Sequence, residues 1–270
     1  MASRTKQKEE ARARRLAEEQ ARAEQARRNR RLYMLGGVIL GAIAIAAVAI
    51  AVSSGGSSTP KTVPITKNSK PCKGSDAAVC SLLANIPQSG NTIGNPKAPV
   101  TVTEYGDLQC PICKDFALGI ENQLIKNDVA KGKVKLVYRS LETASASSPD
   151  PAEFGPQQAA AVAAGLQDKG WHYIELFYHH QGAEGTPYVN QTFLNKLAKS
   201  IPGLDYDKWL SDSQSQSALS QVKSDETTAN AQGFQSTPTI TIVGPKGQTQ
   251  PIVGVPGSYG DLESAIKSVQ

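Results

Sequence analysis

The chain has 270 residues and a formal net charge of +5 at pH 7. This charge is concentrated at the N-terminus, where residues 1–31 hold eleven Lys and Arg against five Glu. That segment therefore carries +6, and the other 239 residues together carry −1. A folded part without net positive charge excludes the broad basic face that nucleic-acid binding requires. We expect no nucleic-acid partner, no cofactor and no resident metal.

An apolar segment follows, in which residues 32–52 contain no charged side chain. At about 1.5 Å per residue these 21 residues span about 31 Å, enough to cross the hydrocarbon core of a membrane. Arginines flank its N-terminal side, so the positive-inside rule places residues 1–31 in the cytoplasm. We therefore predict a cytoplasmic basic tail, a single-pass signal-anchor at 32–52 in the cell membrane, and an extracytoplasmic location for the rest. A cleaved signal peptide is the alternative, but the region before the apolar run is long and no clear cleavage box follows.

The part of the chain after residue 85 alternates between strand and helix patterns. Apolar alternation predicts strands, and helix-forming runs between Gly and Pro breaks predict helices. The predicted strands are 100–105, 134–141, 239–243 and 250–255. The predicted helices are 113–130, 157–167, 171–180, 192–200, 206–232 and 259–269. This order predicts an α/β fold in which helices flank one mixed sheet, with a helical insertion at about 150–232.

The most informative motif is Cys110-Pro111-Ile112-Cys113, which follows the first predicted strand and opens a predicted helix. The first sulfur therefore lies at a helix N-terminus, where free backbone N–H groups and the helix dipole favour a thiolate. The second sulfur lies one turn further, close enough for a disulfide, and Pro111 suits the first helical turn. This context predicts dithiol–disulfide exchange with Cys110 as the attacking sulfur. An inert cross-link or half of a zinc site is the alternative.

Two further cysteines, Cys72 and Cys80, lie in a predicted extracytoplasmic linker at 53–84. All four cysteines fall on the predicted outer side of the membrane, and an even number there favours disulfides. We predict a structural disulfide between Cys72 and Cys80; a relay pair that exchanges electrons with the Cys110–Cys113 motif is the alternative. A zinc site of four thiolates is disfavoured, because the seven residues between Cys72 and Cys80 are not a usual ligand spacing.

Three segments resemble the thioredoxin fold. They are residues 94–113 with the cysteine motif, residues 233–244 with Thr237-Pro238, and the C-terminal helix. Together with the helical insertion, they resemble the DsbA family of exported thiol:disulfide oxidoreductases over roughly residues 85–270. The resemblance implies a cis bond before Pro238, with the backbone of Thr237 free to pair with an extended substrate.

The resemblance also implies roles for the residues near the motif. Cys110 would form the mixed disulfide with substrate, and Cys113 would resolve it. Glu104 would be buried beneath the site with a raised pKa and would carry protons during exchange, with Asp107 as the weaker candidate. Strongly oxidising relatives often have a histidine where this chain has Ile112. We therefore expect a less depressed pKa at Cys110 and a milder oxidant.

The function implied is a membrane-tethered oxidase that introduces disulfides into unfolded exported proteins with free thiols. A membrane quinone-linked partner, of the DsbB or vitamin-K-epoxide-reductase-like (VKOR-like) kind, would reoxidise it. A reductase or isomerase on the same fold is the alternative, although isomerases of this class usually carry a dimerisation domain and residues 53–85 are too short for one. A Cu(I)-binding module that uses the two thiolates of the motif is an alternative of another class. Soft Cu(I) sites often recruit Met or His, and the methionines Met1 and Met34 lie outside the predicted exported domain, which disfavours this alternative.

Overall fold

The computed structural model describes residues 76–148 and 153–270. The predicted cytoplasmic tail, the predicted membrane segment at 32–52 and Cys72 lie outside the described residues. Within the two described ranges, no helix is both long enough and apolar enough to cross a membrane.

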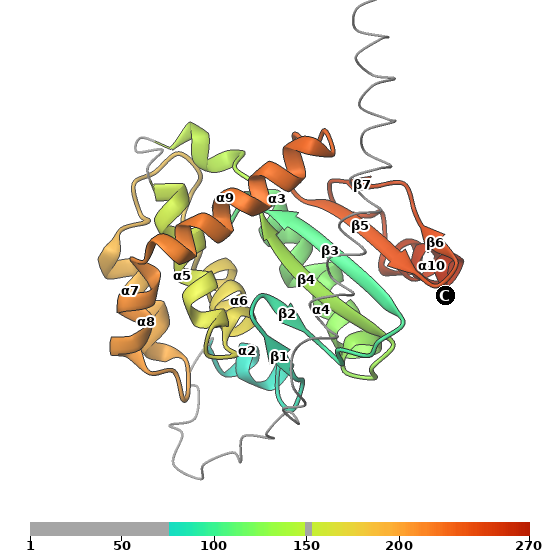
Figure 1. Ribbon diagram of the computed structural model, residues 1–270, viewed down its shortest axis with the longest axis horizontal. Helices are drawn as coiled ribbons and strands as arrows, with labels where there is room; N and C mark the ends of the chain where they lie inside the picture. Colours follow the sequence, from blue (N-terminus) through green and yellow to red (C-terminus); the bar gives the residue numbers. More distant parts are fainter. Residues whose placement is uncertain (1–75, 149–152) are drawn as a thin grey trace, which may run out of the picture. The chain divides into compact units, whose positions relative to one another are not determined.

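The described strands form one mixed sheet of seven strands, in agreement with the predicted α/β fold (Figure 1). They are β1 (Gln88–Ser89), β2 (Thr92–Ile93), β3 (Val100–Gly106), β4 (Val134–Ser140), β5 (Thr239–Gly244), β6 (Gly247–Gln248) and β7 (Ile252–Val253). At the centre, β3 lies parallel to β4 and antiparallel to β5. The β1–β2 hairpin extends the sheet beyond β4, and both β6 and β7 pair with β5 on the other side.

The central strand β3 owes its position to an alternating sequence of β-branched residues. Val100, Val102 and Glu104 are fully buried on one face, whereas Thr101 and Thr103 are half-buried on the other. A carboxyl group therefore continues a row of core valines. The fold places this acid inside the protein and not on the solvated side of the sheet.

The helices cover the sheet and form the insertion (Figure 1). They are α2 (Asp76–Leu82), α3 (Pro111–Phe116), η1 (Ala117–Glu121), α4 (Asn122–Leu124), η2 (Ile125–Val129), η3 (Ala144–Ser147), α5 (Phe154–Gly165), α6 (Gly170–His180), α7 (Gln191–Ser200), α8 (Tyr206–Ser213), α9 (Gln216–Ala231) and α10 (Tyr259–Val269). From α3 to η2 the chain is one continuous helical run, close to the predicted 113–130. However, η1 and η2 are π-helical turns, each of which adds a residue to a turn and rotates the side chains that follow.

Two predicted elements differ from the structure. The single helix predicted at 206–232 is two helices, α8 and α9, because Ser215 caps a new helix by accepting a hydrogen bond of 3.2 Å from the N–H of Ala218. The strand predicted at 250–255 is shorter, since only Ile252–Val253 pairs with β5 as β7.

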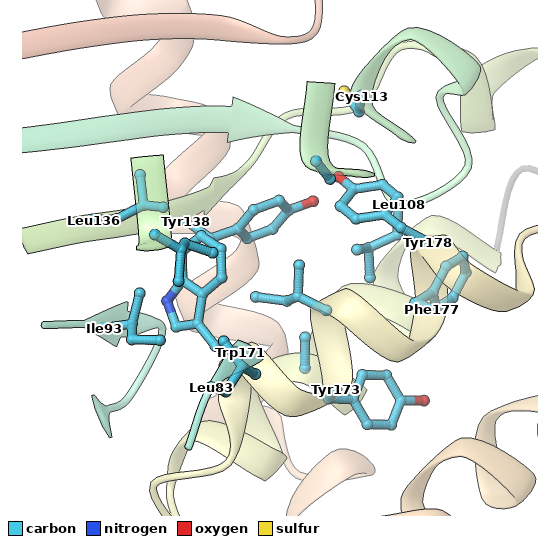
Figure 2. Close-up of a cluster of buried hydrophobic side chains, with 14 of the residues drawn as sticks. Leu83, Ile93, Leu108, Cys113, Leu136, Tyr138, Trp171, Tyr173, Phe177 and Tyr178 are labelled. Carbon is cyan, nitrogen blue, oxygen red and sulfur yellow. The ribbon is translucent and has the colours of Figure 1, made fainter. Parts of the chain in front are cut away.

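The main core lies between the sheet and the helices that flank it. In Figure 2, Trp171 and Tyr178 of α6 point toward Leu136 and Tyr138 of the sheet. Val79 of α2 joins this core, although it belongs to the segment predicted to be a linker. The carboxylate of Asp76 also pairs with His180 at 2.8 Å, so α2 is held to the end of α6.

Candidate active site

The cysteine motif lies at the junction between β3 and α3, as the sequence predicted. Cys110 is the N-cap of α3, with an extended backbone at φ −71° and ψ 121°, and Pro111 occupies the first helical turn. The carbonyl of Cys110 accepts the first helical hydrogen bond from the N–H of Lys114 at 3.1 Å. The N–H groups of Ile112 and Cys113 have no carbonyl one turn earlier in the helix, and both help to lower the pKa of the Cys110 thiol.

The two cysteines have opposite electrostatic environments. Both are free thiols in this structure; Cys110 is 6 % exposed and Cys113 is fully buried. Hydrogen bonding from Cys113, then from Thr237 and the helix N–H groups, outweighs burial and lowers the pKa of Cys110 to about 6. Burial first, and then the contact with Cys110, raises the pKa of Cys113 well above its usual value. At neutral pH the pair therefore consists of one thiolate and one thiol.

The loop before β5 approaches the same sulfur. The Thr237–Pro238 bond is cis, which confirms the sequence prediction. The Sγ atom of Cys110 lies 3.5 Å from the carbonyl oxygen of Thr237, and the hydroxyls of Thr237 and Thr143 share a hydrogen bond. The carbonyl of Pro238 accepts from the N–H of Gly254 at 2.8 Å, so the residues around β7 also border the loop.

Aromatic packing fixes this loop to the sheet. The ring of Phe234 lies edge-on to Tyr105 of β3, with centroids 5.0 Å apart, in a small buried cluster with Leu141 and Ala229. The amide of Gln232 donates to the hydroxyl of Tyr105 at 3.1 Å. The contacts of Phe234 and Gln232 with Tyr105 therefore help to set the position of the loop relative to Cys110.

Asp107, the weaker predicted proton carrier, organises the turn before the motif. Its carboxylate accepts hydrogen bonds from the backbone N–H groups of Gln109 at 3.0 Å, Thr143 at 3.0 Å and Ser145 at 2.8 Å. Both of its oxygens are thus occupied by backbone donors. These bonds tie the turn before Cys110 to the segment after β4.

Glu104 is buried as predicted, and its surroundings change its acidity. Its backbone pairs with Tyr138 of β4 on one side and Ile240 of β5 on the other. Burial is the main cause that raises its pKa, and the negative charge of Cys110 raises it further. The carboxyl therefore holds its proton at a higher pH than an exposed glutamate does.

Three buried residues of the site escaped the sequence analysis. Glu121 and Glu175 are fully buried in η1 and α6, and burial raises the pKa of both. Gln181, at the end of α6, donates from its side-chain amide to the carbonyls of Leu108 at 2.8 Å and Cys110 at 3.0 Å. Each is a single polar residue in a helical pattern, and no local motif distinguishes it from a surface residue.

Exposed apolar side chains border the site. Ile112 of the motif is 47 % exposed, and Val253 and Val255, next to the residue that bonds Pro238, are also exposed. Exposed aliphatic groups beside a reactive sulfur offer contact area to an unfolded chain.

Cys80 belongs to α2 and is disulfide-bonded.

Comparison with known proteins agrees with this geometry. The thioredoxin family profile matches residues 88–266. The chain is 24% identical over 154 residues to a probable disulfide bond formation protein D of Bacillus anthracis, covering 57% of this chain and 69% of that protein. It is 27% identical over 150 residues to disulfide bond formation protein D of Bacillus subtilis, covering 56% and 66%.

A solved structure shows the same fold. Oxidised BdbD from Bacillus subtilis superposes with a TM-score of 0.54 at 23% sequence identity, covering 68% of this chain and 98% of that one. The profile match spans more than half of the chain. The free cysteines Cys110 and Cys113 lie at the start of a helix, beside the loop that contains the cis-proline. This chain therefore belongs to the thioredoxin family and is a thiol:disulfide oxidoreductase.

Proposed function

We propose that this enzyme introduces disulfides into exported proteins through the Cys110–Cys113 pair. The observation that carries the proposal is the contrast between the two sulfurs, one with a pKa near 6 and one with a pKa well above its usual value. A thiolate of low pKa is a good leaving group, so it gives up a substrate sulfur readily. Stabilisation of the Cys110 thiolate also stabilises the dithiol form relative to the disulfide, which favours oxidation of the substrate.

The exchange proceeds in two steps. A substrate thiolate attacks the sulfur of Cys110 in the oxidised enzyme, the Cys110–Cys113 bond breaks, and Cys113 leaves with the bonding electrons. A second substrate thiolate then attacks the first substrate sulfur and displaces Cys110 as a thiolate. Two substrate thiols have lost two electrons, and the enzyme holds a dithiol.

Glu104 supplies the proton for the first step in this proposal. The leaving sulfur of Cys113 is fully buried, and an unpaired charge there is costly. Glu104, itself buried and with a raised pKa, influences the pKa of Cys113 through its charge, so the two groups lie within electrostatic reach. A proton that moves from Glu104 to Cys113 neutralises the sulfur as it leaves.

Substrate docks beside the sulfur through backbone and apolar contacts. Cys110 has no S–H to donate either as a thiolate or as part of a disulfide, so the carbonyl of Thr237 beside it is free to accept a hydrogen bond from an extended peptide. Pro238 holds this carbonyl in place, and exposed Ile112, Val253 and Val255 contact apolar side chains of an unfolded client.

We further propose where the enzyme works and what recycles it. The likeness to disulfide bond formation proteins supports an extracytoplasmic site of action and a membrane redox partner. Residues 32–52 anchor the chain in the cell membrane with residues 1–31 in the cytoplasm, and a quinone-linked protein of the DsbB or VKOR-like kind restores the disulfide. The disulfide of Cys80, with Cys72 as its partner, is structural.

Oxidation of an unfolded protein with two free thiols by the oxidised full-length enzyme tests the proposal. Cys110→Ala should abolish thiol consumption, and Cys113→Ala should abolish it too, because neither variant can form the Cys110–Cys113 disulfide. Thiol consumption that persists in Cys110→Ala would overturn the assignment. Equilibration with glutathione tests the direction, since a couple more reducing than glutathione would instead indicate a reductase.

A further inference from the structure

Three carboxyl groups meet in the core beneath the cysteine pair. Glu104 of β3, Glu121 of η1 and Glu175 of α6 are each 0 % exposed, and α6 packs against η1. The side chains of Glu104 and Glu121 are in hydrogen-bonding contact, the charge of Glu175 acts on Glu121, and the charge of Glu104 acts on Glu175. Only Glu104 belongs to the exchange chemistry proposed above. The other two carboxyls have no assigned role there.

The described part of the chain gives these acids no donor. No backbone N–H, amide, guanidinium or ammonium group hydrogen-bonds to any of the six carboxyl oxygens. The nearest positive influence is Lys126 of η2, an exposed side chain that acts on Glu175 only. Buried carboxylates without donors are strongly disfavoured, and like charges disfavour each other further. Protons must therefore remain within the cluster at neutral pH.

A contact between two carboxyl groups is a hydrogen bond only if one of them keeps its proton. Burial favours the protonated form of Glu121, and a negative charge on either of its neighbours, Glu104 or Glu175, favours it further. Glu104 has Cys110 and Cys113 beside it, the groups that exchange protons during the reaction. The proton of Glu121 is thus the one that stays, and Glu104 is the group that titrates.

The Glu104 carboxyl group has little room to move. A Cβ atom on Gly106 would lie 3.0 Å from Oε1 of Glu104 and 2.7 Å from the ring of Tyr138, so both side chains fill the space above this glycine. In Figure 2 the hydroxyl ends of Tyr138 and Tyr178 point toward one another, and both are buried without a hydrogen bond of normal geometry. These uncharged hydroxyls complete the wall around the cluster and add no charge that could replace a proton.

We propose that Glu121 is a positioning residue that permanently keeps its proton and donates a hydrogen bond to Glu104. The proposal rests on the exchange function assigned to Glu104 above. When Cys113 takes a proton from Glu104, the O–H of Glu121 stabilises the carboxylate that remains. When the pair is reoxidised, the proton returns from Cys113 to Glu104. Burial, and then the charge that Glu104 carries once it has given up its proton, keep Glu121 neutral throughout.

Two substitutions separate hydrogen-bond donation from proton transfer. Glu121→Gln keeps an N–H donor and loses the titratable proton, whereas Glu121→Leu loses both. We expect Glu121→Leu to slow single-turnover oxidation of a dithiol peptide by about tenfold to a hundredfold, because an acid–base group contributes about 10²–10⁴-fold and only part of this is lost. Its pH–rate profile should also move upward in pH, since Glu104 loses a donor that lowers its pKa. Glu121→Gln should restore most of the rate and the original profile.

Controls distinguish this inference from the function on which it depends. Glu263→Leu on exposed α10 is the matched control and should leave both rate and profile unchanged. Alkylation of Cys110 should remain fast in every Glu121 variant, which shows that the cysteine pair is intact. If Cys110-dependent oxidation keeps its rate and profile in Glu121→Leu, the positioning role is wrong while the exchange function stands. If Glu121→Gln is as slow as Glu121→Leu, the proton of Glu121 itself moves and the donor role is wrong.

An infrared measurement keeps the inference testable if Glu121→Leu does not fold. The full-length enzyme should show a protonated carboxyl band that persists across the pH range in which the protein is folded and disappears in Glu121→Gln. A band that is absent in the parent, or unchanged in Glu121→Gln, contradicts a permanently protonated Glu121.

Discussion

The side-chain amide of Gln181 donates a hydrogen bond of 3.0 Å to the carbonyl oxygen of Cys110, which lies 71 residues earlier in the chain. The same amide donates to Leu108 at 2.8 Å, and the carbonyl of Gln181 lies 3.4 Å from the ammonium of Lys114. Gln181, at the end of α6, thus contacts residues before, at and after the start of α3. The helical insertion is therefore part of the support of the active-site sulfur.

We predict that Gln181→Leu destabilises the reduced protein by about 2 kcal/mol, because two buried carbonyls lose a donor at a cost of about 1–3 kcal/mol each, partly offset by relaxation. Urea unfolding of the reduced full-length protein measures this. Gln191→Leu is the control, since the amide of Gln191 bonds only Asn195 on an exposed helix face. Equal unfolding midpoints for the parent and Gln181→Leu would contradict the prediction.

We predict that Cys110 reacts with iodoacetamide at a rate that rises through pH 6 and levels off above pH 7, because its thiolate forms with a pKa of about 6. Cys113 should stay unlabelled over this range, since burial raises its pKa and blocks access. In urea-unfolded protein the rate of Cys110 should instead rise near the ordinary thiol pKa of about 8.5. Mass spectrometry after short pulses gives both rates, and faster labelling of Cys113 would reverse the two assignments.

We expect Thr143 to influence the pKa of Cys110 indirectly, through Thr237. Its hydroxyl bonds that of Thr237, whose side chain in turn lowers the pKa of Cys110. Thr143→Val preserves the shape and removes the hydroxyl. Loss of about 1 kcal/mol of hydrogen bonding corresponds to about 0.7 of a pH unit, so the labelling midpoint of Cys110 should rise by about that amount. Thr143→Ser should restore it; a midpoint that is the same in all three proteins counts against the coupling.

The double variant Cys72→Ser/Cys80→Ser should unfold at a lower temperature, because closing a short loop stabilises by about 2.5 kcal/mol on the chain-entropy account. It should still oxidise a dithiol peptide at close to the parent rate, since Cys80 lies on α2 and not at the motif. Thermal unfolding and oxidation measured on one preparation decide the matter. Unchanged unfolding with lost oxidation would support the relay alternative.

The local patterns of the sequence predicted most of the fold and the place of the cysteine motif at a helix start. Strand β3, the helix α10 and the position of Cys110 at a helix start follow from periodicity and from one short motif. The two-residue strands β1 and β2 and the helix α2 were not predicted, because they are too short to show a period. Their stability comes from contacts with β4 and α6, which only the folded chain provides.

The acids behind Glu104 could not be predicted for a different reason. Glu121 lies four residues after Ala117 and three before Leu124, both fully buried, so a helical period places it on the buried face. Its charge is what hides it from sequence analysis, because a glutamate in a helix is ordinarily solvated. Gln181 likewise contacts residues more than seventy positions away, a separation at which sequence pattern carries no information.

Thr237 lies 127 residues after Cys110, and their contact joins the start of the domain to its last third. A chain is synthesised from its N-terminus, so the cysteine motif is made before this loop is. Until β5 has added to β3, the sulfur lacks the hydroxyl of Thr237 and part of the environment that keeps it a thiolate. The reactive sulfur therefore matures late. Before β5 forms, the Cys110 thiol is therefore less reactive, and it forms mixed disulfides with other proteins less readily while the chain folds.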